Sequence, residues 1–522
     1  MGGENPWQRQ CRGPGDLMTS NKPPADICLI LEGTYPYVAG GVSTWTQELL
    51  LTHQDLTFHL ISLVPSQMDL TLRYQIPRNV VGLTHVFVDR PPAGASSLRH
   101  AEELFQRLEE PLLRLLSGCG LTEIEVILEL FKPYRRQLGS RLLLNSRPAW
   151  EMLLRMYNHT QRESSFLDYF WTWRGLLGGL YSVLLAELPA ARVYHAVSTG
   201  YAGLMAARTH LETGRPALVT EHGIYAMERR IEIAMAAWLL EAQSSGLSIS
   251  KRRRDLKDMW VDTFVSYSRA CYEACSKIIT LYEGNQQFQI RDGAPPERLQ
   301  VIPNGIDYER FSAIPRDPGP RPPTVVLIGR VVPIKDIKTF IRACAILREI
   351  VPDLQALIMG PTEEDADYFQ ECQTLVNHLA LQHTVSFTGR VNLTEHLGRM
   401  DVLALTSISE AQPLVILEAG AAGVPTVATD VGACREMIFG GANEIPPLGP
   451  GGEVTPLSNP TATAHAIAKL LANPEWHEQC SRTMKTRVQR YYNKADLDRS
   501  YRNLYETYRS APETAACVGG KC

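Results

Sequence analysis

The stretch Asp26-Ile-Cys-Leu-Ile-Leu-Glu32 sets the fold of the first half of the chain. A continuous apolar run bounded by charged residues is typical of a strand buried on both faces of a parallel sheet. A glycine-bearing loop follows, and residues 42–51 are expected to form a helix. The alternation predicts βαβ units and an α/β domain with a parallel sheet. Further strands are expected at 58–64, 80–88, 192–196, 217–221 and 277–281.

The same rhythm restarts after a segment rich in Pro and Gly at residues 314–323. A chain of 522 residues also exceeds what one hydrophobic core usually supports, so two Rossmann-like domains are predicted. Strands of the second domain are expected at 324–328, 355–359, 385–387, 402–405 and 426–429.

Composition and helical patterns suggest how the chain is divided. A helix-rich stretch that is poor in strand patterns reads as an insertion in the first domain, and the last helical pattern covers 474–508. The expected segments are a disordered tail at 1–24, an N-terminal Rossmann-like domain at 25–303 with a helical insertion at about 93–172, a C-terminal Rossmann-like domain at 304–490, a helix at 491–510 and a flexible tail at 511–522.

Composition excludes several classes of protein. Hydrophobic residues make up 44% and charged residues 21%, which is ordinary for a globular protein. The formal charge of −4 gives no global electrostatic case for nucleic acid. The 11 cysteines are scattered without CxxC pairs, as in reduced cytosolic proteins. Residues 1–24 lack the apolar core of a signal peptide, and the apolar stretch 175–186 is too short to span a bilayer, so a cytoplasmic location is expected.

Two candidate site segments lie in the first domain. Gly40 and Gly41 come between the first strand and the first helix, where paired glycines and a helix N-terminus favour a phosphate. A plain tight turn explains the same glycines. His222 follows the strand at 217–221, and ligands of open α/β sheets bind at the carboxyl ends of strands. A helix-capping or core histidine is the alternative.

The second domain carries the charged candidates. Arg330 and Lys335 lie on the loop after its first strand and could clamp a diphosphate, although two cations on a solvated loop are common. Glu410 is expected on a loop and Glu418 inside the helix that Pro413 would begin in its first turn. A carboxylate on the loop can hold sugar hydroxyls, and one on the helix can hold ribose hydroxyls. An acid in the first turns of a helix is also a routine complement to the helix dipole.

Two other charged clusters carry weaker hypotheses. Asp365 and Asp367 superficially resemble a magnesium pair, but they lie in an acidic helix start, so no metal site is expected there. The basic run at 251–254 lies in a second, polar insertion. It is either a solvated loop or a docking segment for a membrane protein or anionic lipid.

Taken together, these motifs resemble glycosyltransferase family four, the retaining enzymes of the GT-B fold. The resemblance covers about residues 26–508, and its specific part lies in the second domain. It rests on motifs that occur in the family's order: Pro303-Asn-Gly-Ile-Asp307, Gly329-Arg330 with Lys335, Gly360-Pro361, Phe387-Thr-Gly389 and the pair Glu410/Glu418. It implies two domains facing across a cleft and a C-terminal helix that crosses back to the first domain.

The resemblance also assigns roles. Arg330 and Lys335 would bind the donor diphosphate, with Gly40 and Gly41 approaching the phosphate from the other domain. Glu418 would bind the ribose, Glu410 the transferred sugar, and His222 would line the reaction centre. Supporting donor loops would include Asn304, Gly305, Gly360, Gly389, Gln412, Pro413 and Leu414.

A closer resemblance is to the glycosyltransferases of bacterial Pel exopolysaccharide assembly. It rests on Leu31-Glu-Gly-Thr-Tyr-Pro-Tyr-Val-Ala-Gly-Gly-Val-Ser43, Thr220-Glu-His-Gly-Ile-Tyr225 and Ser407-Ile-Ser-Glu-Ala-Gln-Pro413. It implies a UDP-sugar donor carrying a hexose or an N-acetylhexosamine, a growing polysaccharide as acceptor, and inner-membrane proteins of the Pel complex as partners. Bacterial glycogen synthases carry a Lys shortly before their Gly-Gly, and its absence here argues against a glucan acceptor.

The chemistry that the resemblance implies is transfer with retention and without a metal or other cofactor. Cationic side chains and backbone N–H groups would stabilise the leaving diphosphate. Two alternatives stay open. One is a family-four enzyme with a different acceptor. The other is a catalytically retired scaffold subunit of a polysaccharide secretion complex.

Overall fold

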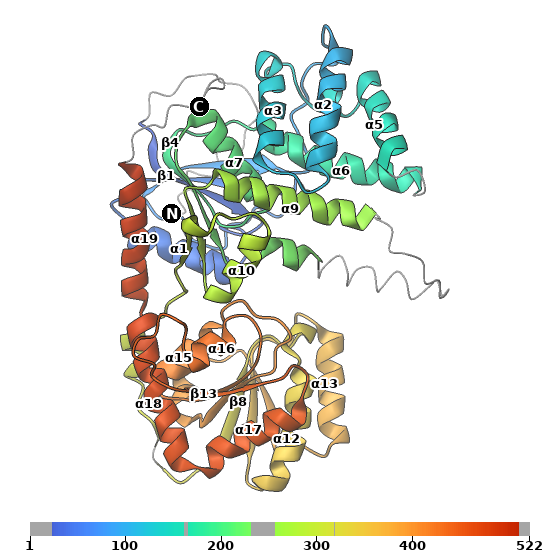
Figure 1. The fold of residues 1–522 in the computed structure, drawn as a ribbon. Helices are drawn as coiled ribbons and strands as arrows, with labels where there is room; N and C mark the ends of the chain where they lie inside the picture. The colour runs from blue at the N-terminus through green and yellow to red at the C-terminus, as the bar shows by residue number, and fades with distance from the viewer. Residues whose placement is uncertain (1–22, 161–164, 231–255, 318, 511–522) are drawn as a thin grey trace, which may run out of the picture.

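The computed structural model describes residues 23–160, 165–230, 256–317 and 319–510. Figure 1 shows two α/β domains, one above the other, with a helix-rich lobe on the upper domain. All strand pairings within the two sheets are parallel. The predicted fold class of two parallel-sheet Rossmann-like domains is confirmed.

The sheet of the N-terminal domain has the order β3-β2-β1-β4-β5-β6-β7. Its strands are β1 (Ala25–Glu32), β2 (Phe58–Val64), β3 (Val80–Phe87), β4 (Ala191–Ala196), β5 (Ala217–Glu221), β6 (Lys277–Thr280) and β7 (Leu299–Val301). The central strand β1 is buried along most of its length, as its apolar run predicts. The sequence did not indicate β7, because three residues are too few to show a strand pattern.

Four helices of this domain, namely α1 (Gly41–Thr52), α7 (Tyr201–Thr213), α9 (Leu256–Ala274) and α10 (Glu283–Arg291), accompany its sheet. The lobe between β3 and β4 contains α2 (Ala101–Leu115), α3 (Leu121–Phe131), α4 (Ser140–Leu143), α5 (Arg147–Thr160) and α6 (Phe166–Leu185). The prediction that this insertion ends near residue 172 was wrong, because α6 continues to Leu185. Its glycines do not break it: a Cβ on Gly179 would lie 2.2 Å from the Tyr201 hydroxyl, so this glycine lets α6 pack closely on α7.

The sheet of the C-terminal domain has the order β10-β9-β8-β11-β12-β13. Its strands are β8 (Thr324–Ile328), β9 (Gln355–Met359), β10 (Val385–Gly389), β11 (Val402–Leu405), β12 (Thr426–Thr429) and β13 (Gly452–Thr455). The α-helices are α11 (Tyr308–Ser312), α12 (Ile337–Ile350), α13 (Ala366–His378), α14 (Leu393–His396), α15 (Leu414–Ala421), α16 (Cys434–Phe439), α17 (Pro460–Ala472) and α18 (Pro474–Tyr491). Short 3-10 helices lie in both domains. The N-terminal domain contains η2 (Lys132–Tyr134) and η3 (Pro296–Arg298), and the C-terminal domain contains η4 (Pro333–Lys335) and η5 (Leu397–Arg399).

The last helix, α19 (Lys494–Arg509), crosses back to the N-terminal domain, as Figure 1 shows at its left edge. The Tyr505 hydroxyl lies 2.8 Å from Nδ1 of His195, and Arg502 Nη1 lies 2.5 Å from a carboxylate oxygen of Asp55. The single helical stretch expected at 474–508 is in fact two helices. They separate where Asn493 pairs with Ile306 of the linker and its side chain caps α19.

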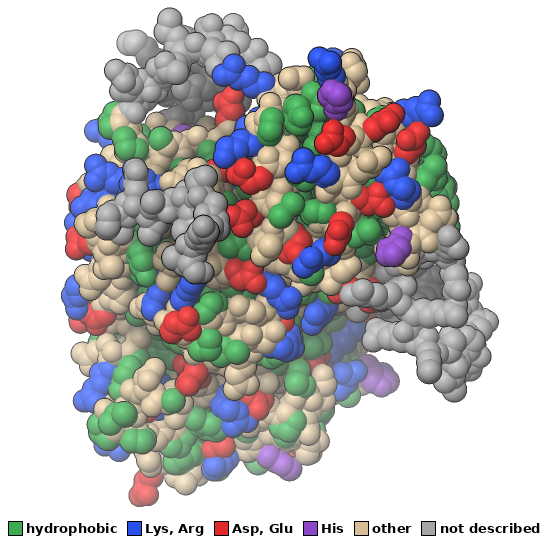
Figure 2. Space-filling view, turned by 45° about the horizontal axis from the view of Figure 1, so that its top comes forward, with side chains coloured by type: hydrophobic (Ala, Val, Ile, Leu, Met, Phe, Trp, Pro, Cys, Tyr) green, Lys and Arg blue, Asp and Glu red, His purple; other side chains and the backbone are tan. Residues whose placement is uncertain are grey.

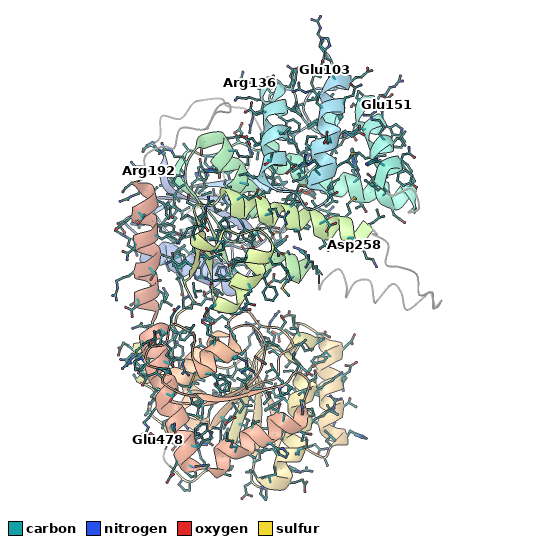
Figure 3. All side chains as sticks on the ribbon, in the orientation of Figure 1. Glu103, Arg136, Glu151, Arg192, Asp258 and Glu478 are labelled. Carbon is teal, nitrogen blue, oxygen red and sulfur yellow. The ribbon has the colours of Figure 1, made fainter. Side chains whose placement is uncertain are left out.

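One face of the surface mixes charges of both signs. Figure 2 shows acidic and basic side chains interspersed on the face that it presents, and Figure 3 shows Glu103 and Arg136 pointing away from the helical lobe. In the described part of the chain, every helix is too short or too polar to cross a membrane. The tails expected at 1–24 and 511–522 lie, apart from residues 23 and 24, outside the described residues.

Candidate functional site

A cavity of about 370 Å³ lies between the two domains and is also bordered by α19. The N-terminal domain contributes residues of α1, and the C-terminal domain contributes the loop after β7, α11 and the start of α15. Its lining includes Gly41, Trp45, Asn304, Gly305, Arg310, Gln412, Leu414, Glu418 and Lys494. Six of these nine were predicted from sequence motifs, whereas Trp45, Arg310 and Lys494 stand in no recognisable motif.

The paired glycines lie at the start of α1. Gly40 has an extended backbone with φ 171°, and Gly41 is the first residue of the helix, so neither is needed for a left-handed turn. A Cβ placed on either glycine would meet no atom within 4 Å. No side chain among the described residues caps α1. The open space and uncapped N–H groups favour a close approach by an anion over a plain tight turn.

Glu418 lies on α15 and faces the cavity. Burial raises the pKa of its carboxyl group, and the charge of Arg310 offsets part of that effect. Pro413 is the N-cap of α15, so the prediction that it lies in the first turn was wrong by one residue. Pro lacks an N–H and fits either position, which is why the pattern alone could not separate them. Leu414 is the first residue of the helix and is partly exposed to the cavity.

Gln412 ties the α15 loop to the linker between the domains. Its Oε1 accepts a hydrogen bond from the Asn304 N–H at 2.7 Å, and its Nε2 donates to the Asn304 carbonyl at 3.2 Å. The residue after Asn304 has to be a glycine, since a Cβ on Gly305 would lie 2.8 Å from the Cα of Lys494. The predicted supporting loops therefore meet at one place, where the chain passes between the domains.

Lys335 and Glu410 form an ion pair at the carboxyl edge of the second sheet. The distance from Lys335 Nζ to Glu410 Oε1 is 2.5 Å, and the Ser407 hydroxyl donates to the same oxygen at 2.6 Å. Both side chains are largely buried, with 20% and 11% of their surface exposed. Arg330 instead pairs with Glu364 and is half exposed. The two cations of the expected clamp thus have separate acidic partners in this structure.

Glycines bring the backbone ends of three neighbouring strands together at this edge. Gly360 has φ +153°, and a Cβ there would lie 1.9 Å from the Gly329 carbonyl oxygen, so only glycine fits. Its N–H donates to the Gly389 carbonyl at 2.9 Å, and Gly389 itself has φ +68°. The loops after β8, β9 and β10 therefore lie close together beside Arg330.

His222 comes directly after β5 and packs against Trp45, with ring centroids 4.8 Å apart. Both ring nitrogens are buried, and neither has a hydrogen-bond partner of good geometry among the described residues. Burial lowers the pKa of His222 to about 4, and the nearby Val197 backbone offsets part of the effect. His222 therefore relates to the cavity only through Trp45, which lines it, and is not itself a lining residue.

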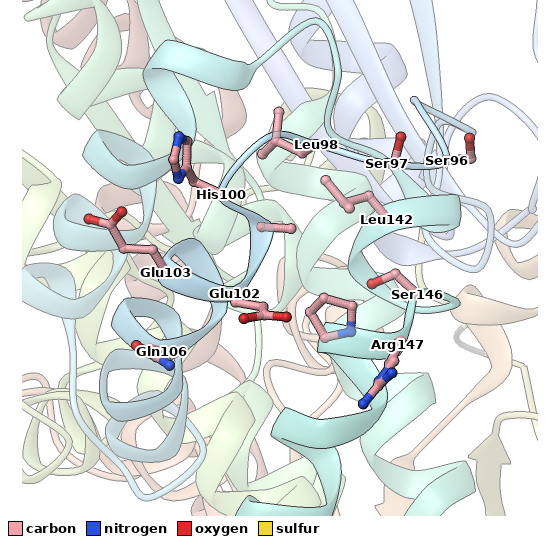
Figure 4. A pocket seen from close by; sticks show the side chains of 12 residues that line it. Ser96, Ser97, Leu98, His100, Glu102, Glu103, Gln106, Leu142, Ser146 and Arg147 are labelled. Atoms are coloured by element: carbon pink, nitrogen blue, oxygen red, sulfur yellow. The ribbon is translucent and has the colours of Figure 1, made fainter.

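The cavity lining does not include Arg330, Lys335, Glu410 or His222, and the remaining candidates also lie apart from it. Asp365 caps α13 by accepting a hydrogen bond from the Tyr368 N–H at 2.9 Å, which is the helix-start role expected for it. Across the described ranges, no group of three or more His, Cys, Asp or Glu residues is arranged to hold a metal ion. The basic run at 251–254 lies outside the described residues. A second cavity, of about 680 Å³, lies in the helical lobe between Glu102 and Arg147 (Figure 4) and contains none of the predicted residues.

The arrangement of two parallel-sheet domains, a cleft-side cavity and a returning helix matches solved structures of the GT-B fold. Sucrose-phosphate synthase from Thermosynechococcus elongatus aligns with a TM-score of 0.55 at 16% identity, over 92% of this chain and 98% of that one. HepE from Anabaena, in complex with UDP, aligns with a TM-score of 0.56 at 14% identity, over 92% and 99% of the two chains. These likenesses establish the GT-B fold.

More than half of the chain, residues 25–297, matches the family described as domain of unknown function DUF3492, and the chain belongs to this family. Residues 313–487 match the family described as glycosyl transferases group 1.

Relatives of known activity are similar over part of their length. D-inositol 3-phosphate glycosyltransferase of Kribbella flavida is 27% identical over 47% of this chain and 56% of its own length. Alpha-maltose-1-phosphate synthase of Mycolicibacterium smegmatis is 26% identical over 48% of this chain and 63% of its own length. The chain thus spans less than two thirds of the length of either relative.

Proposed function

We propose that the chain is a retaining glycosyltransferase that moves a hexose or an N-acetylhexosamine from a UDP-sugar to a growing exopolysaccharide. One observation carries the proposal: Gly41 of the first domain and Glu418 of the second line the same cavity. These two residues were expected to approach the phosphate and the ribose of one donor. The match of residues 313–487 to glycosyl transferases group 1 supports the same activity.

The charges at the carboxyl edge of the second sheet and the N-terminus of α1 suit departure of a nucleoside diphosphate. As the anomeric C–O bond breaks, negative charge develops on the leaving phosphate. Lys335 and the uncapped N–H groups of α1 would stabilise that charge, and they would do so best where domain closure excludes water. Glu410, held by Lys335, would then accept hydrogen bonds from the sugar hydroxyls. We propose that these groups replace a metal, so that turnover continues in EDTA.

The donor nucleotide is the part of the proposal that binding assays can test first. HepE is described in complex with UDP, whereas one relative from Mycolicibacterium smegmatis is a GDP-mannose-dependent mannosyltransferase. Thermal unfolding should be measured with UDP, GDP and ADP, each at equal concentration. UDP at one hundred times its Kd should stabilise the native state by about 2.7 kcal/mol. Stabilisation by GDP alone would replace the donor, and stabilisation by none of the three would refute the donor site.

We further propose that the acceptor is a Pel-type polymer and that the chain is a PelF-like enzyme. It would act in the cytoplasm, at the inner membrane through proteins of the Pel complex. Two of the three segments of this resemblance contribute Gly41 and Gln412 to the lining of the cavity, and His222 of the third contacts the lining residue Trp45, which supports this finer assignment. Polymer production by a strain lacking the gene should return with the wild-type chain and not with Glu410→Gln. Restoration by the variant would favour a scaffold subunit instead.

A further inference from the structure

Helix α6 of the helical lobe exposes apolar side chains on the face that points away from the core. Trp171 is 60% exposed, and Leu167, one turn earlier, is 62% exposed. Gly175, one turn later, is also exposed, so these three residues form one row along the helix. The opposite face carries Tyr169 and Trp173, which are almost fully buried. A helix at a free surface carries polar residues in such a row, so this row indicates a surface that a partner covers.

Neighbouring rings widen the row into a patch of fixed shape. Trp150 of α5 is 45% exposed, and its ring centroid lies 6.1 Å from that of Phe170. Phe170 in turn contacts Trp171, with ring centroids 5.0 Å apart. Figure 1 shows α6 between α5 and α9 at the base of the helical lobe. We call Trp150, Leu167, Trp171 and Gly175 the lobe patch. Because its rings hold one another in place, the lobe patch is preformed for a partner.

Two charges of opposite sign flank the row. Asp168 is exposed and Arg174 is half-buried, and they stand three residues before and three residues after Trp171. Three residues turn an α-helix by about 300°, so the two charges lie on opposite sides of the row. Arg174 donates a hydrogen bond to the Leu144 carbonyl at 3.3 Å, and neither charge forms an ion pair within the described part of the chain. The row therefore presents one cation and one anion that a partner can pair.

This arrangement is complementary to itself. In a two-fold contact, residues on the symmetry axis meet their own copies, and a residue on one side meets the residue on the other side. With the row along the axis, the Trp171 rings of two copies would stack and the two Leu167 side chains would pack together. Asp168 of each copy would then face Arg174 of the other, with the two α6 helices crossing at a steep angle. Gly175 would let the helices approach closely.

A second copy suits the lobe patch better than a lipid surface does. Lipid would bring the exposed Asp168 carboxylate against apolar chains without a cation, which is costly. A second copy supplies that cation as Arg174, and the symmetry gives two such ion pairs in each dimer. We infer that the chain forms a two-fold dimer through the lobe patch, with Asp168 of each copy paired to Arg174 of the other. The dimer goes beyond the proposed function, and its test reads mass and not turnover.

Sedimentation velocity of the full chain over a range of concentrations is the test. The wild-type chain should sediment as a species of twice its 58.3 kDa. Asp168→Arg would bring two guanidinium groups together on each side of the axis, and it should weaken the dimer about tenfold or more. Combining Asp168→Arg with Arg174→Asp restores both pairs in the reverse direction. This double exchange should return the Kd of the dimer to within about threefold of wild type.

Glu103→Arg is the matched control, because Glu103 is exposed on α2 and points away from the helical lobe (Figure 3). It makes the same change of charge and should leave the dimer intact. Asp168→Asn, which adds no cation, serves in place of Asp168→Arg if the latter does not fold by circular dichroism, and it should weaken the dimer by a smaller factor. Trp171→Asp should abolish the dimer.

Three results would overturn the inference. The first is a wild-type chain that is a monomer at every concentration. The second is a folded Asp168 variant that dimerises as tightly as wild type, or a folded double exchange that stays as weak as Asp168→Arg alone. The third is a monomer that cosediments with phosphatidylcholine vesicles and loses this binding in Trp171→Asp, which would assign the lobe patch to a lipid surface.

Discussion

The two domains share a parallel-sheet architecture, and each buries a glutamate whose partners differ between the domains. In the N-terminal domain, Glu221 accepts hydrogen bonds from the neutral side chains of Thr199, Tyr272 and Gln289, and burial raises its pKa. In the C-terminal domain, Glu444 is fully paired with Arg487. Burial raises the pKa of Glu444, but the hydrogen bonds from Arg487 and the Leu448 N–H outweigh it, so the pKa is lowered.

A similar contrast holds at the carboxyl edges of the two sheets. The N-terminal edge presents His222, whose burial favours the neutral form, and a wall of aromatic rings. The C-terminal edge presents Lys335 and Glu410 as a preformed ion pair. Under the proposed function, the donor diphosphate would replace Glu410 as the partner of Lys335, whose position the ion pair already fixes.

The largest expected effect concerns the buried pair of the C-terminal domain. Arg487→Met would leave Glu444 uncompensated in a site where the two side chains are 1% and 4% exposed. Removing one partner of a buried pair typically costs about 3–5 kcal/mol. The free energy of unfolding from urea denaturation, followed by circular dichroism, should fall by that amount.

The matched control is Arg482→Met, five residues before Arg487 on α18. Arg482 pairs with Glu478, which Figure 3 labels at the edge of the domain, and their side chains are 72% and 64% exposed. Exposed pairs contribute little, so this variant should change the stability by less than about 0.5 kcal/mol. Equal losses in the two variants would contradict the view that paired burial supports this domain.

The next effect concerns catalysis at the C-terminal edge. Glu410→Gln keeps the shape of the side chain but removes the charge that faces Lys335. We expect kcat to fall about 10²–10³-fold, because the lost interaction matters mainly in the transition state. The Kd of UDP, measured by calorimetry, should stay the same or decrease slightly, since Lys335 loses a competing anion. Wild-type turnover in a folded variant would exclude this role for Glu410.

A smaller effect should separate the two predicted cations. Lys335→Ala removes a largely buried charge and should weaken UDP binding by about 2–4 kcal/mol. Arg330 is 52% exposed and paired with Glu364, so Arg330→Ala should cost only about 1 kcal/mol. Lys338→Ala, on the surface of α12, is the charge-matched control and should bind UDP normally. A UDP affinity within twofold of wild type for Lys335→Ala would remove this residue from the donor site.

The sequence predicted the strands well where apolar runs are continuous, as in β1, β8, β11 and β12. It missed β7 and β13, which are three and four residues long and show no strand pattern. It also ended the helical lobe too early, because glycines in α6 indicate a break unless the close contact with Tyr201 is known.

For the candidate site, the sequence motifs showed which loops carry the candidate residues, but they did not show which residues contact one another. The Lys335–Glu410 pair joins residues 75 positions apart, and the Gln412–Asn304 contacts join residues 108 apart. Only the folded chain brings such residues together. Trp45 lies in the first helix, where an aromatic residue is ordinarily read as core, so its contact with His222 could not be anticipated.

The smallest expected effect tests whether His222 is held neutral by the N-terminal domain. Its folded pKa of about 4 lies below the unfolded value of about 6.5, so the unfolded chain binds more protons between these values. The free energy of unfolding should therefore fall as the pH drops from 6.5 towards 4. His195, whose burial lowers its pKa to about 3, adds to the same slope. His222→Phe keeps the ring contact with Trp45 and should remove roughly 1–2 kcal/mol of the loss between pH 6.5 and pH 5.

Urea denaturation at both pH values measures this difference, with the exposed His378→Phe as control. An unchanged slope in His222→Phe would mean that His222 is protonated as readily in the folded chain as in the unfolded one.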